Sequence, residues 1–149
     1  MPLGIEELHH VTLTSSDLDR SRAFYGEILG LTEIERPAFP FPGAWFEIAP
    51  GQQLHLIVHD AATYRVSPLI DTRDVHFAIR VANYVSAVNF LRSLGYKETT
   101  SENQSSAPGS ERLMRLQPNG KAGFPQIYLL DPDRHVIEIN AAQLSANFQ

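Results

Sequence analysis

The chain has 149 residues, 43% of them hydrophobic, which is enough for one ordinary globular domain with a buried core. Its formal net charge is −5 and no block of lysine or arginine occurs, so we expect a small-molecule partner and no nucleic acid. The absence of cysteine excludes disulfides, iron–sulfur clusters and thiolate zinc sites, so any metal must be held by His, Asp or Glu. Because no apolar stretch is long enough to span a bilayer and no secretory signal is recognisable, we expect no membrane association and a cytoplasmic location.

The first half of the chain predicts a strand, a helix and three more strands. The run LHHVTLT, Leu8–Thr14, predicts the first strand, and Asp17 lies where a helix N-cap would sit. Leu29-Gly30 predicts the end of that helix, because glycine readily adopts the left-handed conformation that follows a helix. An apolar residue then opens the second strand, and AWFEIAPGQQLHLIVH, starting at Ala44, predicts two more strands around a Pro-Gly turn.

The second half repeats this order, with His76 standing 66 residues after His10. Asn83 takes the N-cap position, Leu94-Gly95 ends the helix, and PQIYLLDPDRHVIEIN predicts a closing hairpin around Asp-Pro-Asp. Between this helix and the closing hairpin, residues 99–111 predict a solvated loop. The segment RLMRLQ, residues 112–117, predicts an additional edge strand.

We therefore predict an α+β fold made of two βαβββ modules. The modules cover about residues 5–60 and 72–142, with a linker at 61–71, inside one domain spanning residues 1–149. A single sheet of this kind needs a partner to bury its second face, so we expect the modules to pair into a curved mixed sheet around a shared cavity.

Strand alternation assigns the polar side chains to the cavity side of these sheets. In the first strand Val11 and Leu13 form the apolar set that should face the helix, which leaves His10 and Thr12 on the opposite side and His9 as a bystander. The same reasoning assigns eight residues to the cavity side of the sheets: His10, Thr12, His55, His59, His76, Arg80, Glu138 and Asn140.

Four of these residues form a candidate metal-ligand set: His10, His55, His76 and Glu138. A single histidine on a strand is more often a satisfied surface or core residue than a ligand. Three histidines at corresponding positions of the two modules, with a carboxylate at the fourth such position, favour a metal site. Imidazole and carboxylate ligands without sulfur suit one divalent ion such as Zn, Ni, Fe, Mn or Co, with one or two positions left for water or substrate.

Three motifs, HHVTL with DLDRSRAFYGEILGL, VHFAIRV and LLDPDRHVIEIN, resemble the vicinal oxygen chelate superfamily. That superfamily includes glyoxalase I, fosfomycin-resistance enzymes, type I extradiol dioxygenases and bleomycin-resistance proteins. The resemblance implies ligands from the first and fourth strands of each module, which fall on the same four residues. His55 stands at a position that is usually Glu or Gln and is often not a ligand. Members commonly dimerise, so a homodimer is implied.

The resemblance also implies a chemistry in which the metal takes two neighbouring oxygens of a small substrate and stabilises an enolate or oxyanion. Glu138 then acts either as both ligand and base, or as a ligand only while a bound water or hydroxide takes the proton. We therefore predict a glyoxalase-I-like lyase or isomerase. Lactoylglutathione lyase proper is disfavoured, because Thr14 and His59 occupy the positions that hold glutathione in the bacterial type.

Substrate contacts are expected from Arg80, His59, Thr12, Trp45, Phe41 and Asn140. Arg80 either binds a carboxylate or phosphate or is simply solvated. The aromatic linker RPAFPFPGAW, which holds Phe41 and Trp45, forms either a wall of the pocket or packing at the domain edge.

Two alternative functions remain. An Fe(II) extradiol-type dioxygenase needs two histidines and one carboxylate, which His10, His76 and Glu138 supply. Typical dioxygenases of this type are about twice as long, however, and His55 would occupy a position that oxygen chemistry needs open. A non-catalytic, bleomycin-resistance-like binding protein generally lacks metal ligands, so the ligand set argues against that alternative.

Overall fold

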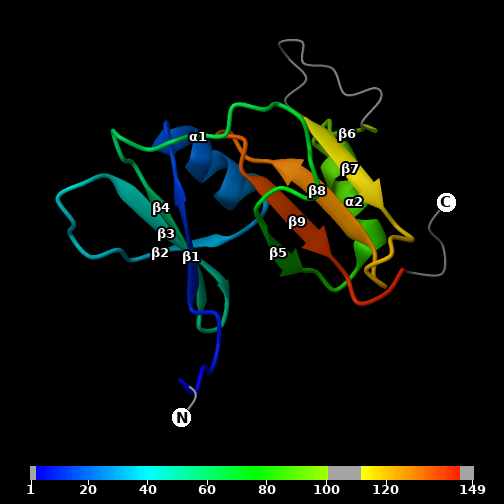
Figure 1. Cartoon of the computed structure of the whole chain (residues 1–149), viewed down its shortest axis with the longest axis horizontal. Coiled ribbons are helices and arrows are strands. Elements are labelled where there is room, and N and C mark those ends of the chain that lie inside the picture. The colour runs from blue at the N-terminus through cyan, green and yellow to red at the C-terminus, as the bar shows by residue number, and fades with distance from the viewer. Residues whose placement is uncertain (1–2, 101–111, 145–149) are drawn as a thin grey trace. The chain divides into compact units, whose positions relative to one another are not determined.

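The computed structural model describes residues 3–100 and 112–144, which form parts of two compact units, residues 1–63 and 64–149 (Figure 1). Most of the loop predicted at 99–111 lies outside the described residues. Each unit has its own mixed sheet and its own helical segment, so the predicted α+β class is confirmed. No helix in the described part of the chain has the length and apolar character needed to cross a membrane.

The first unit contains a four-stranded sheet in the order β1-β4-β3-β2. Its elements are β1 (His10–Thr14), α1 (Leu18–Arg22), the π-helix η1 (Ala23–Ile28), β2 (Thr32–Ile34), β3 (Gly43–Ala49) and β4 (Gln52–Ile57). β1 runs parallel to β4, while β3 pairs antiparallel with both β4 and β2. The predicted order of strand, helix and three strands is therefore confirmed for this unit.

The helix of the first unit starts as predicted but changes type along its length. The side chain of Asp17 caps it by accepting a hydrogen bond from the Arg20 N–H at 3.1 Å. From Ala23 the turns widen, and the Leu29 N–H bonds the Phe24 carbonyl five residues earlier at 3.0 Å. Gly30, with φ of 72°, then ends the segment as the Leu-Gly signal predicts.

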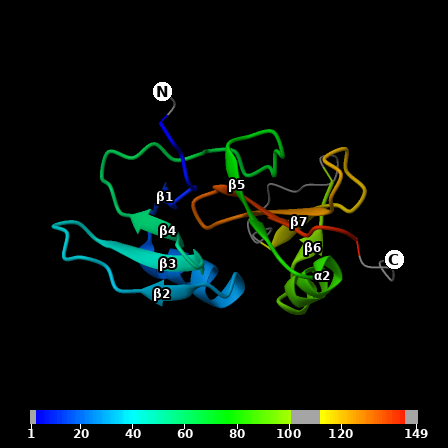
Figure 2. The ribbon, with the colours of Figure 1, turned by 90° about the horizontal axis from the view of Figure 1, so that it is seen from below.

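The second unit contains a five-stranded sheet in the order β5-β9-β8-β7-β6, with α2 on one face of it (Figure 2). Its elements are β5 (His76–Arg80), α2 (Tyr84–Ser93), β6 (Lys97–Glu98), β7 (Leu113–Gln117), β8 (Gln126–Leu130) and β9 (Val136–Asn140). The unit therefore has one strand more than a βαβββ module. The additional strand predicted within residues 112–117 exists as β7, but it is not an edge strand, because β6 pairs with its outer side.

Burial alternates along β1 but not along β9, the strand that carries Glu138. In β1, His10 and Thr12 are exposed while Val11 is partly buried, as alternation predicts. β9 is instead buried along its whole length. Its second face is covered in part by the segment of the same unit that precedes β5, because Ile70 packs in a cluster with Tyr128 and Val136. Glu138 and Asn140 are therefore buried together with the apolar residues of β9.

Candidate metal centre

The four predicted ligands lie in two pairs, one in each unit. His10 on β1 contacts His55 on β4, and His76 on β5 contacts Glu138 on β9. The two pairs come from corresponding elements, since β1 and β4, like β5 and β9, are neighbouring parallel strands. Among residues 3–100 and 112–144, no three His, Asp or Glu side chains form a group able to hold a metal ion.

In the second unit, a hydrogen bond fixes the tautomer of His76. Its Nδ1 lies 2.7 Å from the Asp74 carbonyl oxygen, which can only accept, so Nδ1 must donate. In the neutral imidazole, Nε2 then carries a lone pair, and this atom lies 3.2 Å from Glu138 Oε2. Two lone pairs facing each other repel unless the imidazole is protonated or a cation lies beside both atoms. Metal-ligating histidines typically donate their other ring N–H to a carbonyl in this way, so the pair fits a metal.

The Glu138 carboxylate is buried, 5% exposed, and one of its oxygens is fully engaged. Oε1 accepts hydrogen bonds from the Asn140 amide at 2.8 Å and from the Gln126 amide at 3.2 Å. Burial acts to raise the pKa of Glu138, but the bonds from Asn140, Gln126 and Tyr128, together with nearby His76, outweigh it and lower the pKa. The carboxylate is therefore ionised at neutral pH, with Oε2 directed toward His76.

Asn140 also connects Glu138 to Arg80. While its Nδ2 donates to Glu138, its Oδ1 accepts a hydrogen bond from Arg80 Nε at 2.9 Å. The guanidinium of Arg80 lies over the ring of Phe124, 5.2 Å from the ring centroid. Because β5 and β9 pair with Arg80 opposite Asn140, the three polar side chains share one face of the sheet.

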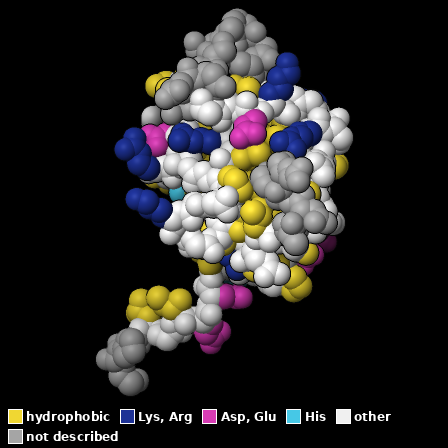
Figure 3. Space-filling view, turned by 90° about the vertical axis from the view of Figure 1, so that its right-hand side faces the viewer, with side chains coloured by type: hydrophobic (Ala, Val, Ile, Leu, Met, Phe, Trp, Pro, Cys, Tyr) yellow, Lys and Arg dark blue, Asp and Glu magenta, His cyan; other side chains and the backbone are white. Residues whose placement is uncertain are grey.

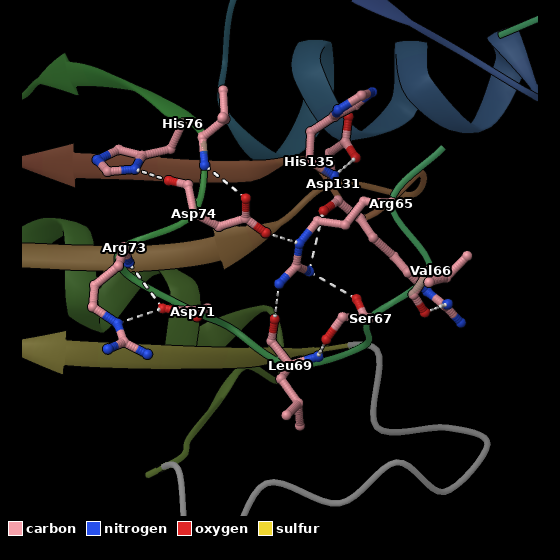
Figure 4. Close-up of polar contacts among 12 residues, drawn as sticks. Arg65, Val66, Ser67, Leu69, Asp71, Arg73, Asp74, His76, Asp131 and His135 are labelled. Carbon is pink, nitrogen blue, oxygen red and sulfur yellow. Dashed lines mark hydrogen bonds and ion pairs between the residues drawn. The ribbon is translucent and has the colours of Figure 1, made fainter. Parts of the chain in front are cut away.

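The linker before β5 orients His76 through Arg65 (Figure 4). The guanidinium of Arg65 donates to Asp74 Oδ2 at 2.5 Å, and to the carbonyl oxygens of Ser67 and Leu69 at 2.7 Å each. The hydrogen bond from Arg65 is the main reason why the pKa of Asp74 is lowered. Arg65 thus ties together the turn whose Asp74 carbonyl receives the Nδ1–H of His76.

In the first unit, His55 is held between two other rings. Its imidazole stacks on Trp45 at a centroid distance of 3.9 Å and on His10 at 4.3 Å. Register places Trp45 directly opposite His55 on β3, whereas His10 is opposite Gln53 and reaches His55 diagonally across β1 and β4. Burial, followed by the neighbouring charges of His10, His9 and Arg36, lowers the pKa of His55 to about 4.

The hydrogen bonding of His55 restricts what it can bind. Its Nε2 lies 2.8 Å from Gln53 Oε1, an acceptor, so Nε2 donates and only Nδ1 keeps a lone pair. Stacked rings carry their lone pairs in nearly parallel planes, and the His10 and His55 rings are tilted by only 17°. A metal held by both side chains would therefore require one ring to rotate.

The remaining predicted substrate residues differ in placement. Phe41 stacks with Phe39 at 5.3 Å, so part of the aromatic linker packs on itself. His59 follows the end of β4 and is exposed, and its Nδ1 accepts a hydrogen bond from the Ala61 N–H at 3.1 Å. Thr12 is exposed on β1 beside His55. Trp45, Arg80 and Asn140 contact predicted ligands or their immediate partners, as described above.

Sequence reasoning missed two residues of this arrangement, Gln126 and Arg65. Gln126 donates to both Glu138 and Tyr128, the latter at 2.9 Å. Its parity in PQIYLL, opposite Asn140 across the hairpin, is a signal that alternation alone would have identified. Arg65 lies in the linker, where no periodicity indicates which carbonyl oxygens a guanidinium will meet.

Basic side chains do not form a continuous patch on the one face of the molecule that Figure 3 shows. On the face seen in Figure 3, Lys and Arg side chains are separated by acidic, apolar and uncharged ones. This agrees with the net charge of −5 and with a site built for a small molecule.

Comparison with known proteins gives one family. The model of the Glyoxalase/Bleomycin resistance protein/Dioxygenase superfamily matches residues 7–139. The chain is 27% identical over 140 residues to Glyoxylase I 4 of Arabidopsis thaliana, an alignment covering 93% of this chain and 72% of that protein. It is also 27% identical over 146 residues to the glutathione transferase FosA of Serratia marcescens, covering 95% and 85% respectively.

Solved structures show the same fold. A glyoxalase/dioxygenase from Nostoc punctiforme matches with a TM-score of 0.66 and 24% identity, covering 95% of this chain and 94% of that one. A point mutant of the fosfomycin resistance protein FosX of Listeria monocytogenes, in a complex with Mn(II) and 1S,2S-dihydroxypropylphosphonic acid, matches with a TM-score of 0.64 and 22% identity. That alignment covers 94% of this chain and 95% of FosX.

Proposed function

Because the chain belongs to the Glyoxalase/Bleomycin resistance protein/Dioxygenase superfamily, we propose that it is a divalent-metal-dependent lyase or isomerase resembling glyoxalase I. Its substrate is a small molecule that chelates the metal through two adjacent oxygens. The names of two relatives, a glyoxalase I and a glutathione transferase, support an enzyme rather than a binding protein. We propose that it works in the cytoplasm as a homodimer.

The observation that carries this proposal is the His76–Glu138 pair. The imidazole donates its Nδ1–H to a carbonyl and directs Nε2 at an ionised, buried carboxylate, and this arrangement supports the proposal that the pair forms half of a metal site. His10 and His55 supply the other half in the proposal, from one chain or from a second copy. Mn, Zn, Ni, Fe and Co all suit this donor set, and FosX supports Mn(II) as the first ion to test.

The proposed reaction removes a proton from a carbon next to a carbonyl. A divalent metal supplies Lewis-acid stabilisation of the negative charge that develops on the substrate oxygens. We assign the proton transfer to Glu138 at Oε2, the oxygen that no amide holds. Asn140 and Gln126 keep the carboxylate oriented while its protonation state changes. Further substrate contacts are proposed from Thr12, Phe41, Trp45, His59, Arg80 and Asn140.

Hydrogen–deuterium exchange tests this function without knowledge of the natural substrate. Dihydroxyacetone has adjacent hydroxyl and carbonyl oxygens, and loss of its methylene protons in D₂O is followed by NMR with Mn(II)-loaded protein. We expect exchange above that caused by Mn(II) alone, and a fall of about 10²-fold or more in Glu138→Gln. Glu47→Gln, an exposed glutamate on β3, is the matched control. Exchange that is unchanged in Glu138→Gln would contradict the role of Glu138.

A second candidate, an Fe(II) dioxygenase, is favoured by the state of His55. If His55 stays stacked on Trp45 and bonded to Gln53, His10, His76 and Glu138 remain as two histidines and one carboxylate. This is the ligand set of non-haem Fe(II) oxygenases. Oxygen uptake by Fe(II)-loaded protein in the presence of catechol, without exchange on dihydroxyacetone, would favour this candidate over the lyase.

A further inference from the structure

Arg80 is a cation whose partners in the structure are neutral. Within the same unit, Arg65, Arg73 and Arg92 each form an ion pair with a carboxylate, whereas Arg112, Arg115 and Arg134 donate to backbone carbonyl oxygens. Arg80 instead has the amide oxygen of Asn140 and the ring of Phe124, neither of which neutralises it. Across the described ranges of the chain, no acidic side chain forms an ion pair with Arg80. Arg80 is exposed, so solvent rather than a carboxylate balances its charge, and the guanidinium is accessible to an anion.

The two neutral partners also fix the direction of the guanidinium. Asn140 takes the Nε–H at 2.9 Å, and the plane rests near Phe124 at 5.2 Å from the ring centroid. Both Nη nitrogens are without a hydrogen-bond partner among residues 3–100 and 112–144. A guanidinium held in this way is preorganised to bind an oxyanion through its Nη groups, with little side-chain entropy left to lose.

The position of Arg80 relates this cation to the candidate metal centre. Asn140 bridges the two, because it accepts from Arg80 and donates to Glu138 Oε1 at 2.8 Å. Glu138 and Asn140 are two residues apart on β9, a separation of about 7 Å along a strand. An anion on Arg80 would therefore lie roughly one such step along the sheet from Glu138 and from a metal held there.

We propose that Arg80 is a specificity-determining residue that binds an anionic group of the substrate, a carboxylate, phosphate or phosphonate, about 7 Å along the sheet from Glu138. Asn140 and Phe124 are its positioning residues. The inference rests on the proposed function for the chelating half of the substrate, and on the contacts of Arg80 for the anionic half. It narrows the substrate class to small anionic compounds with two adjacent oxygens at a distance from the charge.

Two probe compounds test the chelating half and the anionic half of the proposed substrate separately. Methyl 3,4-dihydroxybenzoate and 3,4-dihydroxybenzoate offer the same adjacent oxygens, and only the second carries a carboxylate on the far side of the ring. Isothermal titration calorimetry gives Kd for each with Mn(II)-loaded protein. We expect the acid to bind at least about 10-fold more tightly than the ester, in line with a charge-assisted hydrogen bond. Arg80→Met should remove this preference, so that the acid and the ester bind with similar Kd values, and Arg80→Lys should restore part of it.

Arg73→Met is the matched control, because Arg73 is an exposed arginine of the same unit, 89% exposed, that pairs with Asp71. It should keep the preference of the wild type. If the wild type and Arg80→Met show the same ratio of Kd values while both bind the ester, the role of Arg80 is overturned and the proposed function stands. If the wild type binds neither probe, the chelating site is contradicted, and this inference with it.

Discussion

At the residue scale, the described contacts assign different properties to the two candidate ligand pairs. His76 has one ring nitrogen committed to a carbonyl and the other facing a carboxylate, which is suited to a cation. His55 is enclosed by Trp45 and His10 and is a poor proton acceptor. Its neutral form is the one that binds a metal, and also the one that the stacked, buried site favours.

The lowered pKa of His55 predicts how stability depends on pH in metal-free protein. The pKa is about 4 in the folded chain, against 6.5 for an ordinary histidine, chiefly because of burial. Between these values the unfolded state binds more protons, so the free energy of unfolding should rise as the pH increases from 4 to 6.5. Urea denaturation in EDTA, followed by fluorescence of the single tryptophan, Trp45, measures this dependence.

Two variants isolate the contribution of His55. The His55→Gln substitution should flatten the rise, and His59→Gln, which changes an exposed histidine, should leave it as in the wild type. An equal pH dependence in the wild type and His55→Gln would show that His55 titrates normally in the folded chain.

Alternation predicts the face of each candidate side chain but not its partners. It assigns Glu138 and Asn140 to one face of β9 and His76 and Arg80 to one face of β5, as the hydrogen bonds between these strands require. The tautomer of His76 could not be predicted, because its Nδ1 bonds a backbone carbonyl set by the path of the linker. The stacking of His55 depends on the register of three strands, which sequence periodicity leaves undetermined.

At the element scale, the predicted linker at residues 61–71 has a structural role within the second unit, which begins at residue 64. Arg65 bonds the Ser67 and Leu69 carbonyls and the Asp74 carboxylate, and Ile70 covers β8 and β9 (Figure 4). The strand and helix boundaries were largely predictable from caps and glycines, such as Asp17 and Gly30. The π-helical turns of η1 and the inner position of β7 were not, because both depend on packing and pairing with distant residues.

This role of the linker predicts that Arg65 affects metal binding without touching a ligand. Arg65→Met removes the bonds that hold the Asp74 turn, so the Nδ1–H of His76 loses a fixed acceptor. Loss of such outer support should weaken Mn(II) affinity by about 10-fold or more. Calorimetric titration measures the affinity, and ¹⁵N NMR of the imidazole should report mixed tautomers in the variant. Arg73→Met should behave as the wild type, and an Arg65→Met protein with unaltered affinity and tautomer would refute the role of the linker.

At the scale of the whole molecule, the chain consists of two units built on one plan. Each has an N-capped helix, a first strand starting with histidine, and a parallel partner strand that carries a second candidate ligand. This repeat was evident in the sequence, and so was the superfamily. Pairing of the modules around one cavity stays a prediction, and the account of function depends on whether both ligand pairs serve one ion.

The most direct test is therefore the number of metal ions bound per chain, measured by elemental analysis after reconstitution with Mn(II) and removal of free metal. We predict about one equivalent for the wild type and for the His59→Ala control, with sharp losses in His10→Ala, His76→Ala and Glu138→Ala. Losses in variants from both units would mean that both pairs bind the same ion. A wild type that holds no Mn, Zn, Ni, Fe or Co, or variants that hold as much as the wild type, would contradict the proposed metal centre.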